Sequence, residues 1–304
     1  MTGLEVAAIP VFIVTMLLEA AILRGHPEMR GYEVRDTRAS IAMGIVNVLI
    51  NSVAGLLQFA LLTYFSRLAP WHLDAAGWQA WQAWLIAFVA VDFAYYWFHR
   101  ASHDVRILWA AHVNHHSSER YNLSTALRQS WTTPLTSMPF YWPLALAGID
   151  PVMIFALEAV NTLYQYWIHT ELVDRIGWLE MVFNTASHHR VHHGTNIEYL
   201  DRNHGGVFIV WDKLFGTFEP ERAPVRYGLT KNIRTFRLLD IAMHEFRAIA
   251  ADVRRARGIR EVSGYLFASP GWSPDGTTLT SRQLRAAAAA SSEAPDVDAL
   301  QAAA

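Results

Sequence analysis

Five stretches of predominantly apolar residues alternate with polar segments in the first part of the chain. They cover residues 6–23, 40–66, 78–98, 134–149 and 151–168. At a helical rise of about 1.5 Å per residue, roughly 20 apolar residues cross the hydrocarbon core of a bilayer, which is about 30 Å thick. The pattern therefore predicts an all-α fold, an integral membrane helical bundle of about four or five apolar segments.

The third and fourth stretches carry further signals. Tryptophans open the third stretch and Tyr95 to Trp97 close it, which is typical of aromatic belts at the two membrane interfaces. The fourth stretch is short and contains Pro139 and Pro143, so we expect either a full span or a re-entrant arm. Pro151 follows a turn sequence and is placed to start the next helix. These two stretches should form a hairpin that returns the chain to the side it left.

Positively charged residues concentrate in the first polar loop. Four arginines lie there: Arg24, Arg30, Arg35 and Arg38. The loop 67–77 contains only Arg67, and short loops rich in basic residues face the cytoplasm. We therefore expect the N-terminus outside and the first loop in the cytoplasm. Counting spans from there places His99 to His116, and everything after about His169, in a helical cap on the cytoplasmic side.

Composition supports a membrane protein and excludes several other classes. Apolar residues make up 52% and charged residues 17% of the chain, against about 45–50% and 25% in soluble domains. The net charge of -2 and the lack of a long Lys/Arg cluster argue against nucleic acid as a partner. The chain has no cysteine, which excludes disulfides, cysteine-ligated iron–sulfur clusters and thiolate-bound zinc. Any metal must rest on His, Asp or Glu.

Histidines are the unusual feature of the composition, and most of the 14 fall between positions 99 and 204. Three patterns stand out: His99-Arg-Ala-Ser-His103, His112-Val-Asn-His115-His116 and His189-Arg-Val-His192-His193, the last preceded by His188. Residues at i, i+3 and i+4 share one helical face, with Cβ atoms about 5–6 Å apart, so each pattern directs its imidazoles to one point if it is helical. We expect the isolated His26, His72 and His244 to be structural or surface residues.

Eight clustered imidazoles predict two metal ions. Packing so many ionisable rings together is costly unless neutral rings donate their lone pairs to cations, and one ion cannot use eight ligands. Imidazole binds Zn, Cu, Fe and Ni alike, so the spacing does not name the metal. Structural zinc needs only four ligands, the H-E-x-x-H pattern of zinc proteases is absent, and haem needs one or two axial histidines on facing spans. Two redox metals account for the pattern best.

The order HxxxH, HxxHH, HxxHH, joined to this membrane pattern, resembles the fatty acid hydroxylase/sterol desaturase superfamily of membrane di-iron enzymes. The resemblance covers about residues 85–220. Its most specific runs are similar to the group that includes alkylglycerol monooxygenase and its bacterial relatives: Tyr95–Arg100, His115–Ser130, Trp167–Glu171, Ser187–His193 and Trp211–Phe218.

The resemblance implies a set of iron ligands and their supporting residues. The ligands would be His99, His103, His112, His115, His116, His169, His189, His192 and His193. Some relatives carry an HxxxH pattern at His169, but the earlier position here is Gln165. His188 and His204 are either ligands or neighbours of ligands. Asp201 and Asn203 could orient imidazoles through the second ring N–H. Asp92 could do the same or could instead join two spans.

The same resemblance implies two iron ions, O₂ as co-substrate and a lipid substrate in the bilayer that is hydroxylated or desaturated, such as an alkylglycerol ether lipid. A separate electron donor is required because the chain has no cysteine and no nucleotide-binding G-x-G-x-x-G pattern. The implied external reductant is tetrahydrobiopterin. The alternatives are a sterol or fatty-acyl hydroxylase or desaturase, a zinc-dependent membrane hydrolase, and a metal transporter, which should line a continuous path with its histidines rather than crowd one face.

We expect four parts along the chain. Residues 1–84 would form N-terminal transmembrane helices and residues 85–220 a fatty acid hydroxylase-like catalytic domain. Residues 221–267 would be a cytoplasmic extension, whose amphipathic helix either lies on an anionic membrane surface or packs on the catalytic part. Residues 268–304 would be a disordered tail, because the last residues are mostly Ala, Ser, Asp and Glu without an aromatic residue.

Overall fold

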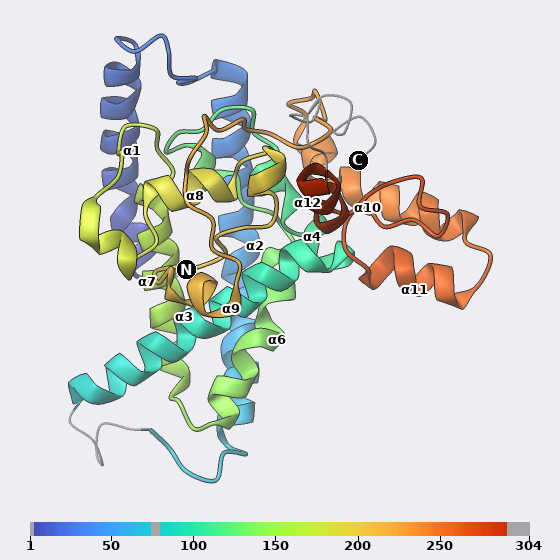
Figure 1. Ribbon diagram of the computed structural model, residues 1–304. Helices are drawn as coiled ribbons and strands as arrows, with labels where there is room; N and C mark the ends of the chain where they lie inside the picture. Colours follow the sequence, from blue (N-terminus) through green and yellow to red (C-terminus); the bar gives the residue numbers. More distant parts are fainter. Residues whose placement is uncertain (1–2, 74–79, 291–304) are drawn as a thin grey trace.

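The structure is a computed structural model that describes residues 3–73 and 80–290 (Figure 1). The described part is all-helical and contains no strand, which confirms the predicted class. The apolar stretches form five helices: α1 (Gly3–Leu23), α2 (Val34–Ser66), α3 (Ala80–Asp104), α6 (Thr133–Leu146) and α7 (Pro151–Trp167). Of the described helices, α2 alone is both long and apolar enough to cross a bilayer, judged by length and composition, and Ala7–Leu23 of α1 forms a shorter apolar helix.

The long helices pack against one another around a common core. Figure 1 shows α2 running through the length of the molecule, with α6 beside it and α3 crossing at an angle. Residues of α2, α3, α6 and α7 make up the largest buried apolar cluster, which includes Leu62, Val91, Tyr141 and Ile154. The helices are also apolar on their outer faces, where Leu56 of α2 is 75% exposed. Helices that are apolar on both faces are typical of a lipid environment.

Polar side chains inside the helical part join helices to their neighbours. The Asn47 amide of α2 donates to the backbone oxygen of Ser130 at 2.5 Å. The Gln58 amide donates to both carboxylate oxygens of Glu158 on α7, at 2.8 and 2.9 Å. Such buried polar groups need partners in an apolar environment, and they fix the register between helices.

Short helices gather around the C-terminal ends of α3 and α7 (Figure 1). They are α4 (Arg106–Ala110), α5 (Val113–His116), η1 (Thr125–Leu127), η2 (Gly177–Met181), α8 (Ala186–His192), η3 (Ile197–Tyr199) and α9 (Val210–Phe215). These elements carry most of the histidines of the sequence motifs, so the packing of short segments, rather than one long helix, positions the site.

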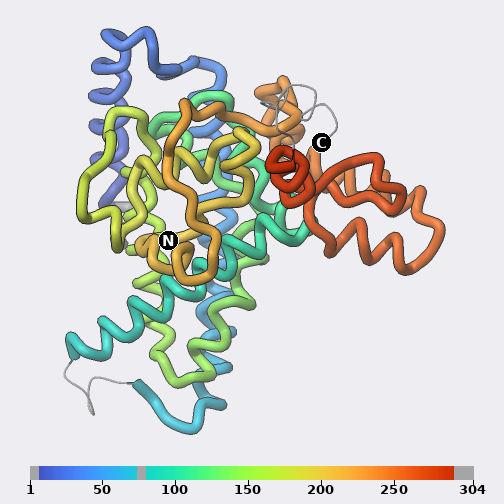
Figure 2. The backbone as a smooth tube through the Cα atoms, viewed as in Figure 1, coloured from blue at the N-terminus to red at the C-terminus, as the bar shows by residue number. Residues whose placement is uncertain are grey.

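The C-terminal segment adds α10 (Leu238–Arg255), α11 (Ile259–Phe267) and α12 (Ser281–Ala290), of which α10 and α11 project to one side (Figure 2). Part of the apolar face of α10 is buried, where Ile241 and Ala242 pack with Ala39 and Met43 of α2. Leu239 of the same helix stays 61% exposed.

The expected disordered tail is a point where the structure differs from the prediction. Residues 268–290 have defined positions, and Leu284 of α12 is only 2% exposed because it packs against Ile197 and Leu200. The expectation of disorder was wrong for this part, because it weighed the alanine-rich composition and not the few apolar side chains that hold α12 in place. Residues 291–304 lie outside the described residues.

Candidate metal centre

Four segments of the chain bring nine buried histidines together. Helix α3 contributes two from its last turns, the segment around α5 contributes three, the end of α7 contributes one and α8 with the next residue contributes three. They form two groups: His99, His103, His112, His116 and His192 in the first, and His115, His169, His189 and His193 in the second. Within each group, the candidate ligand nitrogens all lie within 4.8 Å of one another. These are the nine residues expected from the sequence.

The two groups lie next to each other. The rings of His116 and His193, one from each group, stack with their centroids 4.4 Å apart. His189 and His192, again one from each group, stack at 5.1 Å. Residues three apart, such as His189 and His192, thus serve different groups, whereas residues four apart, such as His189 and His193, share one, which the helical spacing alone does not reveal.

Distances between ring nitrogens fit ligands that share an ion. The Nε2 atom of His112 lies 3.0 Å from Nε2 of His99 and 3.1 Å from Nε2 of His116. In the second group, Nε2 of His169 lies 3.1 Å from Nε2 of His115 and 3.0 Å from Nε2 of His189. With metal–nitrogen bonds of about 2.1 Å, neighbouring ligands of a six-coordinate ion lie about 3.0 Å apart, and those of a tetrahedral ion about 3.4 Å apart.

Burial keeps these imidazoles neutral and leaves lone pairs unused. Burial, reinforced by the neighbouring histidines, holds the pKa values of His189, His192 and His193 well below the usual value. The Nε2 atoms of His192, His193 and His103 are buried and have no hydrogen-bond partner among the described residues. Buried polar nitrogens are rarely left without a partner, and a neutral imidazole nitrogen is a good donor to a cation. The donor set therefore fits metal ions.

Backbone oxygens and one carboxylate hold the outer nitrogens of the rings. The Nδ1 atoms of His99, His192 and His169 lie 2.9, 2.9 and 2.7 Å from the backbone oxygens of residues 204, 202 and 165. Nδ1 of His103 lies 3.3 Å from Oδ1 of Asp201, in the arrangement expected from the sequence. Such contacts orient each ring and leave Nε2 free for a metal. Burial raises the pKa of Asp201, but the hydrogen bonds from His103 and Ser281, together with the charges of nearby histidines, outweigh burial and keep this pKa below its usual value.

The structure places Asp92 away from the imidazoles. Its carboxylate accepts from the backbone N–H groups of Val207 and Phe208, at 2.7 and 3.1 Å. It also accepts from the Asn161 amide at 2.6 Å and the Trp211 indole at 2.8 Å. Asp92 therefore joins α3 to α7 and to residues 207–211, the competing role considered for it.

Asn203 also differs from the expectation. Its amide donates to the backbone oxygens of His188 and Glu219, at 3.0 and 2.7 Å, and its oxygen accepts from the Glu219 N–H at 2.8 Å. The residue has a φ of 57°, a conformation that asparagine tolerates better than most residues. Asn203 thus ties two loops together and donates to backbone oxygens rather than to an imidazole.

The two ambiguous histidines lie outside both groups. The His188 ring packs against Phe218, and burial lowers its pKa to about 4. The His204 ring lies 5.1 Å from that of His103, with Nδ1 3.6 Å from Asp212. The remaining histidines of the chain are likewise absent from both groups, as expected: His26, His72 and His244.

Sequence reasoning missed Asp212 as a support of the site. Its buried carboxylate accepts from the backbone N–H groups of His204 and Gly205, both at 2.7 Å, and from the Thr217 hydroxyl at 2.6 Å. It thereby holds the loop whose backbone oxygen contacts His99. Its place in the Trp211–Phe218 run was the available signal.

Three charged residues that tie α1 and α2 to the site were also missed. Glu19 of α1 accepts from the Leu123 N–H at 2.8 Å and from the Thr170 hydroxyl, next to His169. Asp36 of α2 pairs with Arg128 at 2.5 Å, and Ser118 donates to the same carboxylate at 2.6 Å. Only the folded chain brings these positions to the segments that carry His115, His116 and His169.

Comparison with known proteins agrees with the geometry. Residues 84–217 match the family model described as fatty acid hydroxylase. We refer to this matched segment, which is similar to fatty acid hydroxylases, as the fatty acid hydroxylase domain. The match confirms the resemblance inferred from the histidine motifs, and both histidine groups fall within the matched residues.

Individual relatives extend the match beyond the fatty acid hydroxylase domain. The chain is 44% identical over 271 residues to alkylglycerol monooxygenase of Homo sapiens, covering 88% of the chain and 59% of that protein. It is 40% identical over 268 residues to alkylglycerol monooxygenase of Danio rerio, with the same coverage. It is 28% identical over 152 residues to ornithine lipid hydroxylase OlsE of Rhizobium tropici, covering 49% of the chain and 46% of that protein. The chain thus spans about three fifths of the alkylglycerol monooxygenases it matches. No solved structure matches it.

Proposed function

We propose that the protein is a membrane-bound non-haem di-iron oxygenase that uses O₂ to hydroxylate a lipid. The observation that carries the proposal is the pair of all-histidine groups inside a fatty acid hydroxylase domain, with five and four nitrogen donors. Two groups of this size suit two ions, and donor nitrogens within 4.8 Å of one another allow the rings of each group to share one ion.

The relatives support an ether lipid as the substrate. The chain is most extensively similar to proteins named alkylglycerol monooxygenase, and more distantly similar to a lipid hydroxylase. The substrate we propose is an alkylglycerol, hydroxylated at the carbon next to the ether oxygen, with tetrahydrobiopterin as the external reductant. Hydroxylation or desaturation of a sterol or fatty acyl chain is the alternative within the same superfamily.

The membrane arrangement belongs to the same proposal. α1, α3, α6 and α7 would join α2 as spans or partial spans, because large apolar side chains are exposed on their outer faces. Arginines of the first loop place that loop in the cytoplasm under the positive-inside rule. Both histidine groups lie where α3 and α7 end, so the centre would face the cytoplasm, within reach of a lipid whose body stays in the bilayer.

In this mechanism the protein orients the ligand histidines, buries them and fixes the set of ligands. The nine histidines would hold two iron ions, which supply O₂ activation and attack on an unactivated C–H bond. The Nδ1 contacts of His99, His169 and His192 to backbone oxygens keep the rings in one orientation. All nine side chains are buried, which limits the contact of their ligand nitrogens with bulk water. The low pKa values of the α8 histidines keep protons from competing with the metals.

Metal analysis combined with an O₂-dependent assay tests this proposal. The purified protein in lipid vesicles should contain about two iron ions per chain and convert an alkylglycerol only when O₂ and tetrahydrobiopterin are present. His115→Phe should lose both bound iron and product, whereas His26→Phe, at an exposed histidine outside both groups, should keep both. Turnover of a zinc-loaded protein without O₂ would instead identify a metallohydrolase.

A further inference from the structure

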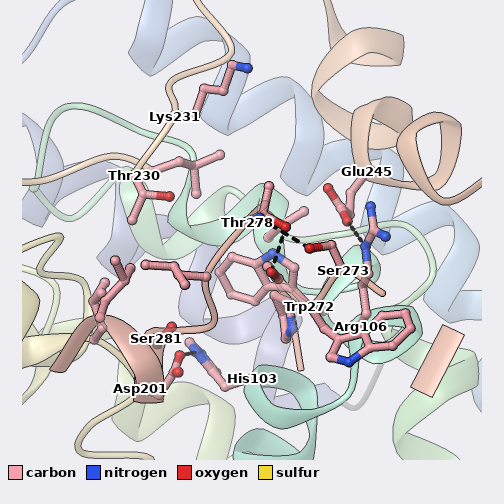
Figure 3. Close-up of a pocket in the computed structure, with 18 of the residues that line it drawn as sticks. His103, Arg106, Asp201, Thr230, Lys231, Glu245, Trp272, Ser273, Thr278 and Ser281 are labelled. Carbon is pink, nitrogen blue, oxygen red and sulfur yellow. Dashed lines mark hydrogen bonds and ion pairs between the residues drawn. The ribbon is translucent and has the colours of Figure 1, made fainter. Parts of the chain in front are cut away.

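A large cavity opens beside the first histidine group. Its volume is about 900 Å³, at the upper end of the range for small-molecule sites. Figure 3 shows His103 and Asp201 at one end of the cavity, Thr230 and Lys231 at another, and the Arg106–Glu245 pair on a further side. A molecule in this cavity would reach the metal centre from outside the fatty acid hydroxylase domain.

The floor of the cavity is the metal centre itself. His103, His116 and His192 of the first group and His193 of the second all line it. The Nε2 atoms of His103, His192 and His193 are among the buried nitrogens without a hydrogen-bond partner in the described residues. An occupant of the cavity would therefore be separated from the metals by little more than the ligand rings.

The outer wall comes from the C-terminal segment, residues 228–284, which lies beyond the residues matched by the family model. This wall is polar. The Arg106 guanidinium bonds Glu245 at 2.8 Å and Asp252 at 2.7 Å, which ties α10 to α4. Trp109 and Trp272 add aromatic surface to the lining. Hydrogen-bonding groups combined with aromatic rings suit a planar, polar molecule better than an alkyl chain.

The position of the cavity also argues against a lipid tail. Among the described residues, the lining contains no residue of α1, α2, α6 or α7, and His103 is its sole residue from α3. The apolar faces that would meet lipid lie on those helices. An alkyl chain that reaches the centre along those helices would thus not pass through this cavity.

We propose that this cavity is the binding site of the electron donor, a small water-soluble heteroaromatic reductant, held between the metal centre and the C-terminal segment. The inference rests on the proposed oxygenase function, which needs such a donor. In the balanced reaction, R–H, O₂ and the reduced donor DH₂ give R–OH, H₂O and the oxidised donor D. The donor loses two electrons and two protons, and these reduce the second oxygen atom to water. Donor and lipid thereby reach one centre from two sides.

A unique cysteine provides a direct binding test, because the chain has none. Thr230 lines the cavity, is partly exposed and has a size close to that of cysteine. With Thr230→Cys, anaerobic tetrahydrobiopterin should slow maleimide labelling by about fivefold or more, and an alkylglycerol should not. Thr235→Cys, on the same segment but outside the cavity lining, should label at an unchanged rate. The inference is overturned if tetrahydrobiopterin leaves the labelling rate of the Thr230→Cys variant unchanged, or if the alkylglycerol slows this labelling.

Steady-state kinetics provide the second test. Thr230→Trp fills part of the cavity and should raise the KM for tetrahydrobiopterin by about tenfold, with iron content and the KM for the alkylglycerol within about twofold of wild type. Thr235→Trp is the matched control. After reduction by dithionite, one exposure to O₂ should give wild-type product in both variants, since the cavity is bypassed. An unchanged reductant KM in an active variant overturns this inference alone, whereas wild-type protein that makes no O₂-dependent product overturns the proposed function and the inference with it.

Discussion

At the scale of single residues, buried carboxylates decide how firmly the histidine groups are held. Asp92 and Asp212 accept hydrogen bonds from backbone N–H groups of the segment 201–217. Asp201, which belongs to that segment, joins it to His103 of α3. That segment supplies the backbone oxygens that orient His99 and His192. Loss of one carboxylate should therefore affect metal binding even where no ligand has changed.

Asp201 allows a clean test of this dependence. Its φ is 50°, so glycine and asparagine fit the backbone there while alanine would be strained. Asp201→Gly removes the partner of His103 and should weaken iron binding by about 10- to 100-fold, whereas Asp201→Asn keeps an oxygen for the hydrogen bond and should lose less. Iron release to a chelator measures both. If the Asp201→Gly variant retains iron as well as the wild-type protein does, Asp201 does not orient His103.

Asp92 should contribute more to stability than to metal affinity. Asp92→Ala leaves two backbone N–H groups, an amide and an indole without their acceptor, and should lower the free energy of unfolding by about 2–4 kcal/mol. Asp104→Ala, at a half-exposed carboxylate near the end of the same helix, should change it by less than about 0.5 kcal/mol. Thermal unfolding in detergent compares the two variants, and a similar loss of unfolding free energy in both would contradict a stabilising role specific to Asp92.

At the scale of elements, α1 and α2 take part in the site although they precede the fatty acid hydroxylase domain. Glu19 of α1 accepts hydrogen bonds from the Thr170 hydroxyl, next to His169, and from the Leu123 N–H. The pair of Asp36 and Arg128 joins α2 to the segment that follows α5. Arg128 also donates to Ser117, next to His116. The first two helices thereby brace two of the four histidine-bearing segments.

A double-mutant cycle on Asp36 and Arg128 tests this brace. Arg128→Met leaves a buried carboxylate without its cation and should cost about 3–5 kcal/mol of stability. The double variant Asp36→Asn with Arg128→Met removes both charges and should recover part of that loss. Unfolding measurements on the two singles and the double give the coupling. Strict additivity would mean that the pair does not act as a unit.

At the scale of the whole molecule, we expect one defined orientation in the membrane. The long helices expose apolar faces, and both histidine groups lie at the same ends of α3 and α7. Single cysteines report the orientation without background because the chain has none. In intact cells, a membrane-impermeant maleimide should label Leu68→Cys, in the loop after α2, and should label His26→Cys, in the loop before α2, only after the membrane is opened. The reverse pattern would place the metal centre on the outer face.

The four histidine-bearing segments should also depend on metal for mutual stability. Chelation of the metals should lower the melting temperature by about 5 °C or more, since ions that bind only the folded state stabilise it. Readdition of iron should restore it. The His115→Phe variant lacks one of the expected ligands, so chelation should change its melting temperature little. If the melting temperature of the wild-type protein is the same with and without the chelator, metal bound at the two groups does not stabilise the fold.

The sequence by itself determined the all-helical class, the five apolar stretches and the nine clustered histidines. It could do so because each of these depends on local spacing: apolar runs form helices, and residues three or four apart share a face. The same local reasoning failed for residues 268–290, where the side chain that orders α12, Leu284, packs on residues about eighty positions earlier in the chain.

Only the tertiary structure decided how the histidines divide into groups of five and four, and that His188 and His204 fall outside them. It also decided that Asp92 binds a loop, that Glu19 and Asp36 contact the histidine-bearing segments, and that the C-terminal segment lines a cavity beside the first histidine group. These features join segments far apart in the chain. Their geometry depends on how buried helices pack and satisfy one another's polar groups, which no local pattern records.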